Sequence, residues 1–218
     1  MSLGARWERR AWRQGFQRVA GVDEVGRGAL FGPVVAAAVV LDPDRMIRGL
    51  NDSKLLEPQR RKELAAVIRQ RAWALAVAGV DAATIDQINI LEATRLAMRR
   101  AVGGIDPAPD LLLVDALRLD WPGPQRSLIH GDARAASIAA ASIVAKVERD
   151  SWMTRWDQVY PAYGLAKHKG YTTARHLEAL ARHGATPLHR RSFAPVAAVC
   201  RFPDQRPSEN LELFDDLY

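Results

Sequence analysis

An α/β fold with a five-stranded mixed sheet, flanked by helices and followed by a helical C-terminal extension, is predicted from three observations. First, five short apolar segments have strand length, at 17–22, 33–41, 72–80, 110–114 and 127–129. Second, segments with helical features occur between and after them, at 58–70, 81–102, 133–156 and 172–183. Third, the chain is 48% apolar and 26% charged, a globular composition. This mixture of elements indicates a sheet covered by helices.

The first two strands form a predicted hairpin. The apolar segment 17–22 leads into two adjacent acids, Asp23 and Glu24. Gly26-Arg27-Gly28 then has the composition of a tight turn. The valine-rich segment 33–41 therefore returns antiparallel to the first strand.

The middle of the chain alternates helix and strand. Pro58 stands where the first turn of a helix tolerates proline, so it begins the helix 58–70. The apolar segment 72–80 is the third strand. Apolar residues recur at helical spacing through 81–102, and the pair Gly103-Gly104 ends that helix.

Two acids follow the last two strands. Asp115 comes directly after 110–114, a run of three leucines and a valine that begins with Asp110. Asp132 comes shortly after 127–129, at the predicted N-terminus of the alanine-rich helix 133–156. A helix N-terminus favours a negative charge.

Charge divides the chain into a basic domain, 1–202, and an acidic tail, 203–218, that we expect to be flexible after Pro203 and Pro207. The tail holds one arginine and five acids, a net charge of −4. Since the whole chain carries +6, the domain carries +10. A basic domain of this kind attracts nucleic acid, although GC-rich codon usage also enriches arginine.

Several classes of protein are excluded by composition. Cys200 is the only cysteine, so neither an internal disulfide nor a cysteine-based zinc site is expected. The longest nearly apolar run, 31–41, contains a proline and falls short of the roughly 20 residues of a membrane span. With no secretory signal recognised, we expect a cytoplasmic protein that does not bind membranes.

Asp23, Glu24, Asp115 and Asp132 are the candidate metal ligands and catalytic residues. Each stands at the end of an apolar segment, where a carboxylate is costly to bury without a cation. In a mixed sheet these ends can meet, and four carboxylates suit a hard cation such as Mg²⁺ or Mn²⁺. The alternative for any single acid is a capping or solvated role.

The sequence around these acids resembles that of the ribonuclease HII family of type 2 ribonucleases H. Residues 19–35 read V-A-G-V-D-E-V-G-R-G-A-L-F-G-P-V-V. Further family motifs follow in order between 17 and 196: Asp52-Ser53-Lys54, Val114-Asp115, Gly131-Asp132, Ser137 to Lys146, Tyr160-Pro161-x-Tyr163-Gly164, His168-Lys169-Gly170-Tyr171 and Arg191-Ser192-Phe193-x-Pro195.

The resemblance implies a ribonuclease H fold and a metal-dependent endoribonuclease that uses all four acids. Its substrates would be RNA/DNA hybrids and duplex DNA with a single embedded ribonucleotide. Cleavage of such DNA on the 5′ side of the ribonucleotide would leave a 3′-hydroxyl and a 5′-phosphate, by metal-ion catalysis. The resemblance assigns recognition of the ribose to Gly26, Arg27, Gly28 and Tyr171. Lys54 and Lys146 lie inside matched motifs and are candidate phosphate contacts, the alternative being solvated surface lysines.

The tail carries a second, shorter resemblance. Asn210-Leu211-Glu212-Leu213-Phe214 resembles the Gln-Leu-x-Leu-Phe peptide that docks bacterial repair proteins on the sliding clamp, with asparagine in place of glutamine. Leu211, Leu213 and Phe214 would then bind the clamp. The alternative is that they fold back onto the domain. We expect the protein itself to be a monomer.

Three competing interpretations are distinguished by sequence features. Ribonuclease HIII usually carries an additional N-terminal domain, whereas only about 16 residues precede the first predicted strand. A non-catalytic nucleic-acid-binding module would lack one of the four acids. Another nuclease or an integrase of the same superfamily would share the carboxylates but not the Gly-Arg-Gly and His-Lys-Gly-Tyr motifs.

Overall fold

The structure, a computed structural model, describes residues 4–200 and contains one five-stranded mixed sheet. Its order is β3-β2-β1-β4-β5, with β2 antiparallel to both β1 and β3, and with β4 parallel to both β1 and β5. The strands are β1 Val19–Val25, β2 Val34–Val40, β3 Ala74–Val80, β4 Leu111–Asp115 and β5 Gln125–Leu128. The predicted mixed sheet is confirmed.

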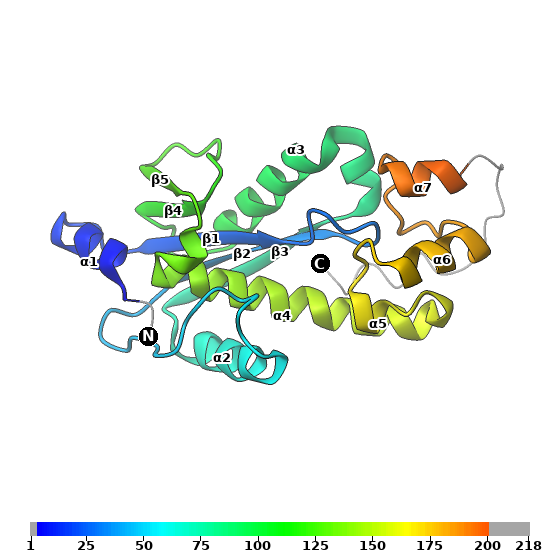
Figure 1. Ribbon diagram of the computed structural model, residues 1–218. Helices are drawn as coiled ribbons and strands as arrows, with labels where there is room; N and C mark the ends of the chain where they lie inside the picture. Colours follow the sequence, from blue (N-terminus) through cyan, green and yellow to red (C-terminus); the bar gives the residue numbers. More distant parts are fainter. Residues whose placement is uncertain (1–3, 201–218) are drawn as a thin grey trace.

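Helices cover both faces of this sheet (Figure 1). Helix α3 (Ala82–Gly103) lies on one face, and α4 (Ala136–Val159) and α2 (Pro58–Arg71) lie on the other. The remaining elements are α1 Arg6–Arg13, the 3₁₀ turns η1 Gly131–Ala133 and η2 Pro161–Tyr163, α5 Leu165–His168, α6 Ala174–His183 and α7 Ala194–Val199. Helices α5, α6 and α7 extend beyond one end of the sheet and form the expected C-terminal extension (Figure 1).

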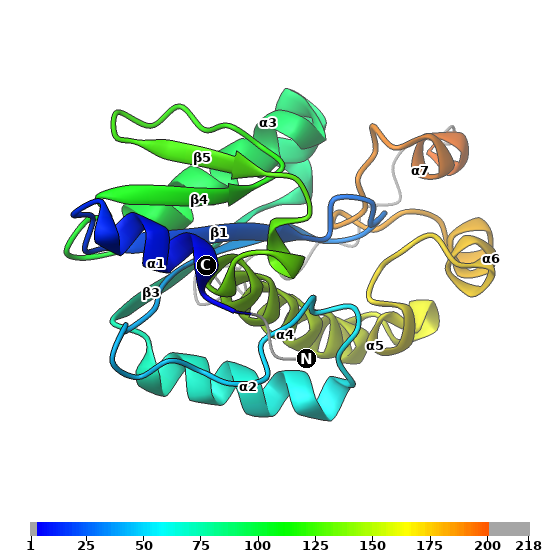
Figure 2. The same ribbon diagram turned by 60° about the vertical axis from the view of Figure 1, so that its left-hand side comes forward.

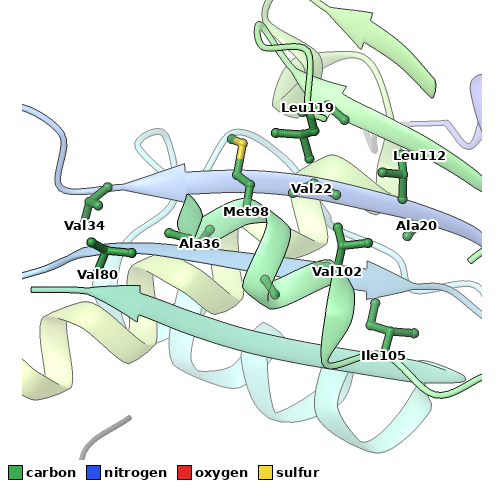
Figure 3. Packing of buried hydrophobic residues seen from close by; sticks show 14 of the residues in the cluster. Ala20, Val22, Val34, Ala36, Val80, Met98, Val102, Ile105, Leu112 and Leu119 are labelled. Atoms are coloured by element: carbon green, nitrogen blue, oxygen red, sulfur yellow. The ribbon is translucent and has the colours of Figure 1, made fainter. Parts of the chain in front are cut away.

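Strand β2 is buried on both faces, which explains its continuous run of valine and alanine. Because successive side chains of a strand point to opposite faces, alternate β2 residues enter two different cores. Val34, Ala36, Ala38 and Val40 pack in the core under α3. Ala37 and Val39 pack in the core against α2 and α4. Figure 3 shows Val22, Met98 and Val102 in the α3 core.

Strand β1 and helix α4 approach each other unusually closely at Gly21. A Cβ atom at this position would lie 2.0 Å from the carbonyl carbon of Ser137, in the first turn of α4. Only glycine allows this contact between backbones. The contact fixes the start of α4 against the strand that carries Asp23.

Several expected boundaries shift by a few residues, and two of the shifts concern candidate site residues. Strand β1 continues to Val25 because its pairing with β2 extends through Asp23 and Glu24, so these acids lie inside the strand. Helix α4 begins at Ala136, which places Asp132 in the separate turn η1 rather than at the helix N-terminus.

Other expectations concern the ends of the chain. Helix α1 was not predicted from its arginine-rich sequence; it forms with Glu8 and Ala11 buried against the domain. The tail 203–218, including Leu211, Leu213 and Phe214, lies outside the described residues. Within residues 4–200, no helix has both the length and the apolar character required to cross a membrane.

Candidate active site

Asp23, Glu24 and Asp115 form one carboxylate cluster at neighbouring strands. Strands β1 and β4 are parallel and pair Val22 with Val114. The next residues of the two strands, Asp23 and Asp115, therefore lie side by side. One carboxylate oxygen from each of the three residues lies within 4.8 Å of the other two. The parallel register therefore joins acids that are 92 positions apart in the sequence.

Among residues 4–200, the acids of the cluster are not balanced by positive charge. Asp23 is only 5% exposed, and burial together with the charges of Glu24 and Asp115 raises its pKa well above the ordinary value. Burial also raises the pKa of Glu24, while Arg27, whose Nη1 lies 3.4 Å from Glu24 Oε1, opposes that rise.

Glu24 Oε2 is buried and has no hydrogen-bond partner among the described residues. A buried carboxylate oxygen without a donor is costly, and a bound cation would remove that cost. Closely spaced carboxylate oxygens are the donors that Mg²⁺ and Mn²⁺ prefer. The three residues therefore fit a divalent metal ion.

Asp23 is oriented by the Ser142 side chain and by the backbone of its own strand. Ser142 of α4 hydrogen-bonds the Asp23 carboxylate, which partly opposes the rise in its pKa. Ser142 Oγ also lies 2.9 Å from Ser53 Oγ, in the loop before α2. The backbone N–H of Glu24 donates to Asp23 Oδ1 at 2.7 Å. Asp23 is thus held from both α4 and its own strand.

Asp132 lies close enough to the cluster for the charge of Asp115 to act on its carboxyl group. The N–H of its neighbour Gly131 donates to Asp115 Oδ1 at 2.6 Å, which ties the turn η1 to β4. Burial, followed by the charges of Asp52 and Asp115, raises the pKa of Asp132, while Lys54 lowers it. Asp132 is not one of the three acids whose oxygens lie within 4.8 Å of one another.

The Gly-Arg-Gly turn and Tyr171 are brought together beside the cluster. Ala29 forms a β-bridge with Tyr171, and the Leu30 N–H donates to the Gly170 carbonyl at 2.8 Å. Gly26 has φ +89°, and a Cβ there would meet Arg149 Nε at 2.2 Å. Gly28 is exposed and has no atom within 4 Å of a Cβ position, so a ligand can approach its backbone.

Two buried arginines, which the sequence analysis missed, hold this turn in place. Arg149 and Arg190 are fully buried, and they donate to backbone carbonyls within the turn, just after it and before Tyr171. The acceptors of Arg149 are Phe31, Pro33 and Lys169, and those of Arg190 are Arg27 and Gly32. Burial and the charge of Arg149 lower the pKa of Arg190 to about 9. Among 26 arginines, nothing in the sequence marks these two as buried.

The two candidate lysines occupy different environments. Lys54 is exposed and its charge acts on Asp132. Lys146 Nζ is 2.7 Å from Asp150 Oδ1 and 5.9 Å from the centre of the Tyr171 ring. Asp52, the neighbour of Ser53, was also missed; its position in the Asp-Ser-Lys motif was the available signal.

Comparisons with known proteins agree with this architecture. The model of the family described as Ribonuclease HII matches residues 20–196. A ribonuclease HII of Solibacter usitatus is 59% identical over 208 residues, covering 95% of this chain and 91% of that protein.

Solved structures show the same fold. The ribonuclease H2 of Pyrococcus horikoshii OT3 matches with a TM-score of 0.71 and 27% identity, over 84% of this chain and 97% of its own. The ribonuclease HII of Archaeoglobus fulgidus, solved in complex with PCNA, matches with a TM-score of 0.68 and 26% identity, over 90% and 100%. The predicted ribonuclease H-like fold is confirmed. The chain belongs to the ribonuclease HII family and is a ribonuclease H, a hydrolase that cleaves the RNA strand of RNA/DNA hybrids.

Proposed function

We propose that this enzyme also cuts duplex DNA on the 5′ side of a single embedded ribonucleotide, leaving a 3′-hydroxyl and a 5′-phosphate. The observation that carries the proposal is the continuity of β1 with the Gly-Arg-Gly turn. The strand holds Asp23 and Glu24, and Gly26 follows two residues after Glu24. A ribose bound at the turn would therefore present an adjacent phosphate to the carboxylates.

The catalytic residues are proposed to be Asp23, Glu24, Asp115 and Asp132, which would hold Mg²⁺ or Mn²⁺. When bound, such ions activate water and stabilise the charge that develops on the leaving 3′ oxygen. The protein supplies the oriented carboxylates: Ser142 fixes Asp23, and the Gly131 N–H fixes Asp115. Ser142 is itself buried between Asp23 and Ser53, so it acts as a positioning residue and not as a nucleophile.

Recognition of the ribose requires polar groups at its 2′-hydroxyl, because this group alone distinguishes ribose from deoxyribose. We assign this role to the backbone of Gly26, Arg27 and Gly28 and to Tyr171. The open space at Gly28 and the bridge that places Tyr171 beside the turn support the assignment. Lys54 and Lys146 are proposed phosphate contacts, because the charge of Lys54 acts on Asp132 and Lys146 lies beside the Tyr171 ring.

The same proposal places the enzyme in ribonucleotide excision repair, as a cytoplasmic monomer. Docking on a sliding clamp through Leu211, Leu213 and Phe214 is supported by the PCNA complex of the Archaeoglobus relative. A saturable titration of a 208–218 peptide against purified bacterial clamp is the expected result. Absence of binding at high micromolar peptide would remove this part of the proposal.

The central test is cleavage of a duplex with one ribonucleotide beside an all-DNA duplex, in Mg²⁺ and separately in Mn²⁺. Only the ribonucleotide duplex should be cut, once, with the product ends stated above. Asp23→Asn, Glu24→Gln and Asp115→Asn should abolish cleavage without unfolding the protein. Tyr171→Phe should weaken binding to the ribonucleotide duplex more than to all-DNA. Near-normal turnover by the three acid variants, or equal losses on both duplexes, would contradict the assignment.

A further inference from the structure

We propose that helix α1 and Arg134 form a second contact for the phosphate backbone of the duplex, beyond the residues assigned to the active site. This inference rests on the proposed function, because the ligand is the same duplex. The contact, here called the α1 basic surface, consists of five arginines: Arg6, Arg9, Arg10, Arg13 and Arg134.

Helix α1 presents only positive charge to solvent. Its one acid, Glu8, is 0% exposed and accepts hydrogen bonds from the Ser137 N–H at 2.8 Å and the Ser137 hydroxyl at 2.6 Å. The four arginines of the helix are all exposed. Because Glu8 is buried, it does not neutralise the arginines on the exposed side of α1.

None of the five arginines has an ion-pair partner within residues 4–200. By contrast, the exposed Arg60, Arg95 and Arg182 each pair with a glutamate on their own helix. Unpaired like charges that lie close together repel one another. A polyanion that covers the surface would offset this repulsion by its attraction to the arginines, and it would release its own counterions.

The surface is hollowed rather than flat. One hollow of about 310 Å³ is lined by Arg6, Trp7, Arg10 and Arg134. An adjoining hollow of about 440 Å³ is lined by Arg6, Arg10, Arg13 and Gln14. The Arg134 guanidinium lies 5.6 Å from the centre of the Trp7 ring, a distance at which a cation–π contact orients the cation. Arg6 and Arg10 border both hollows, so a row of phosphates can contact them together.

The surface is rigidly connected to the carboxylate cluster. Arg134 follows Asp132 by two residues, and the two hydrogen bonds that Ser137 donates to Glu8 attach α1 to the first turn of α4. Helix α4 also carries Ser142, which binds Asp23. Figure 2 shows α1 beside β4 and the beginning of α4. Because a duplex carries one charge per about 1.7 Å of its axis, a duplex cut at the cluster extends phosphates past Arg134.

The experiment compares two double variants of equal charge. Arg6→Gln/Arg10→Gln removes two cations from the α1 basic surface. Arg95→Gln/Arg99→Gln removes two from α3, on the opposite face of the sheet, where each arginine has a carboxylate partner. Cleavage of a duplex of about 30 base pairs with one central ribonucleotide is measured against salt, together with binding to an all-DNA duplex of the same length.

We expect Arg6→Gln/Arg10→Gln to raise KM about fivefold at 0.15 M salt for each arginine–phosphate interaction that the substitution removes, with kcat unchanged. The logarithm of the association constant decreases with the logarithm of the salt concentration, and this slope should become shallower by about 0.9 for each such interaction. The α3 variant should keep the wild-type slope. Arg134→Gln alone should give an intermediate effect, and thermal unfolding of all variants should match the wild type.

Different failures have different signatures. If the wild-type enzyme does not cut the ribonucleotide duplex, the proposed function fails. If the wild type cuts it and the α1 and α3 variants have equal KM and salt slope, only the α1 basic surface is wrong. An α1 variant with unchanged duplex binding but reduced binding to an acidic protein would also overturn the inference, since it would assign the surface to a different class of partner.

Discussion

Asp115→Asn should stabilise the metal-free enzyme while removing most of its response to metal. Asparagine has nearly the same shape and keeps Oδ1, so it can still accept the hydrogen bond from the Gly131 N–H. The substitution therefore changes the charge of the carboxylate cluster with little change in its packing. Measuring unfolding without metal and then with metal therefore separates the effect on stability from the effect on metal binding.

The size of the effect follows from the spacing of the acids. At 4.8 Å, the upper limit on the spacing of the three carboxylate oxygens, two unit charges in an effective dielectric of about 20 repel by about 3 kcal/mol. Burial and its acidic neighbours raise the pKa of Asp23, so proton uptake relieves part of this repulsion without metal. We expect the free energy of unfolding to rise by about 1–2 kcal/mol. For a chain of this length, Tm would increase by about 2–4 °C per kcal/mol.

The assay is thermal unfolding in EDTA and then across a Mg²⁺ or Mn²⁺ titration. At a metal concentration 100 times Kd, the wild type should gain about 2.7 kcal/mol, so its stability overtakes that of the variant. Asp120→Asn is the matched control, because the Asp120 side chain is 95% exposed. If Asp115→Asn were less stable than the wild type in EDTA and equally stabilised by metal, the cluster would not be a metal site.

Further predictions concern the supports of the site and pH. Glu8→Ala should lower the free energy of unfolding by about 2–3 kcal/mol, because the buried Ser137 donors lose their acceptor; urea denaturation measures this, and a loss below 0.5 kcal/mol contradicts it. Gly21→Ala should lower the free energy of unfolding by about 1–3 kcal/mol and reduce cleavage, because the added Cβ would force β1 and α4 apart. Unchanged Tm and activity would refute this. The metal-induced rise in Tm should grow as pH increases through the raised pKa of Asp23, because ions displace its proton; a pH-independent rise would argue against it. Burial lowers the pKa of His189 in the folded protein to about 3. The stability that depends on neutral His189 is therefore fully present above about pH 6.5, and it is lost as pH falls toward 3. This loss, at most about 1.4 kcal/mol per pH unit, should be absent from His189→Gln; identical pH profiles would exclude it.

Local sequence features were sufficient to predict the elements of the sheet. Strand segments such as 110–114 are short and apolar, and strand length and apolar runs are properties of neighbouring residues. The same features placed Asp115 at the end of a strand and predicted an antiparallel return after the Gly-Arg-Gly turn. The extent of β1 was underestimated because pairing with β2, not local composition, extends it through Glu24.

Long-range contacts decided how these elements form a site. The sequence alone identified Asp23 and Asp115 as candidates, but only the parallel register of β1 and β4 makes them neighbours. Likewise, no local pattern distinguishes Arg149 from the exposed arginines, because its burial depends on carbonyls supplied by distant loops. Burial of a charged group depends on its partners in space. The sequence therefore determined which residues are candidates for the chemistry, and the tertiary structure decided which of them meet and which are exposed.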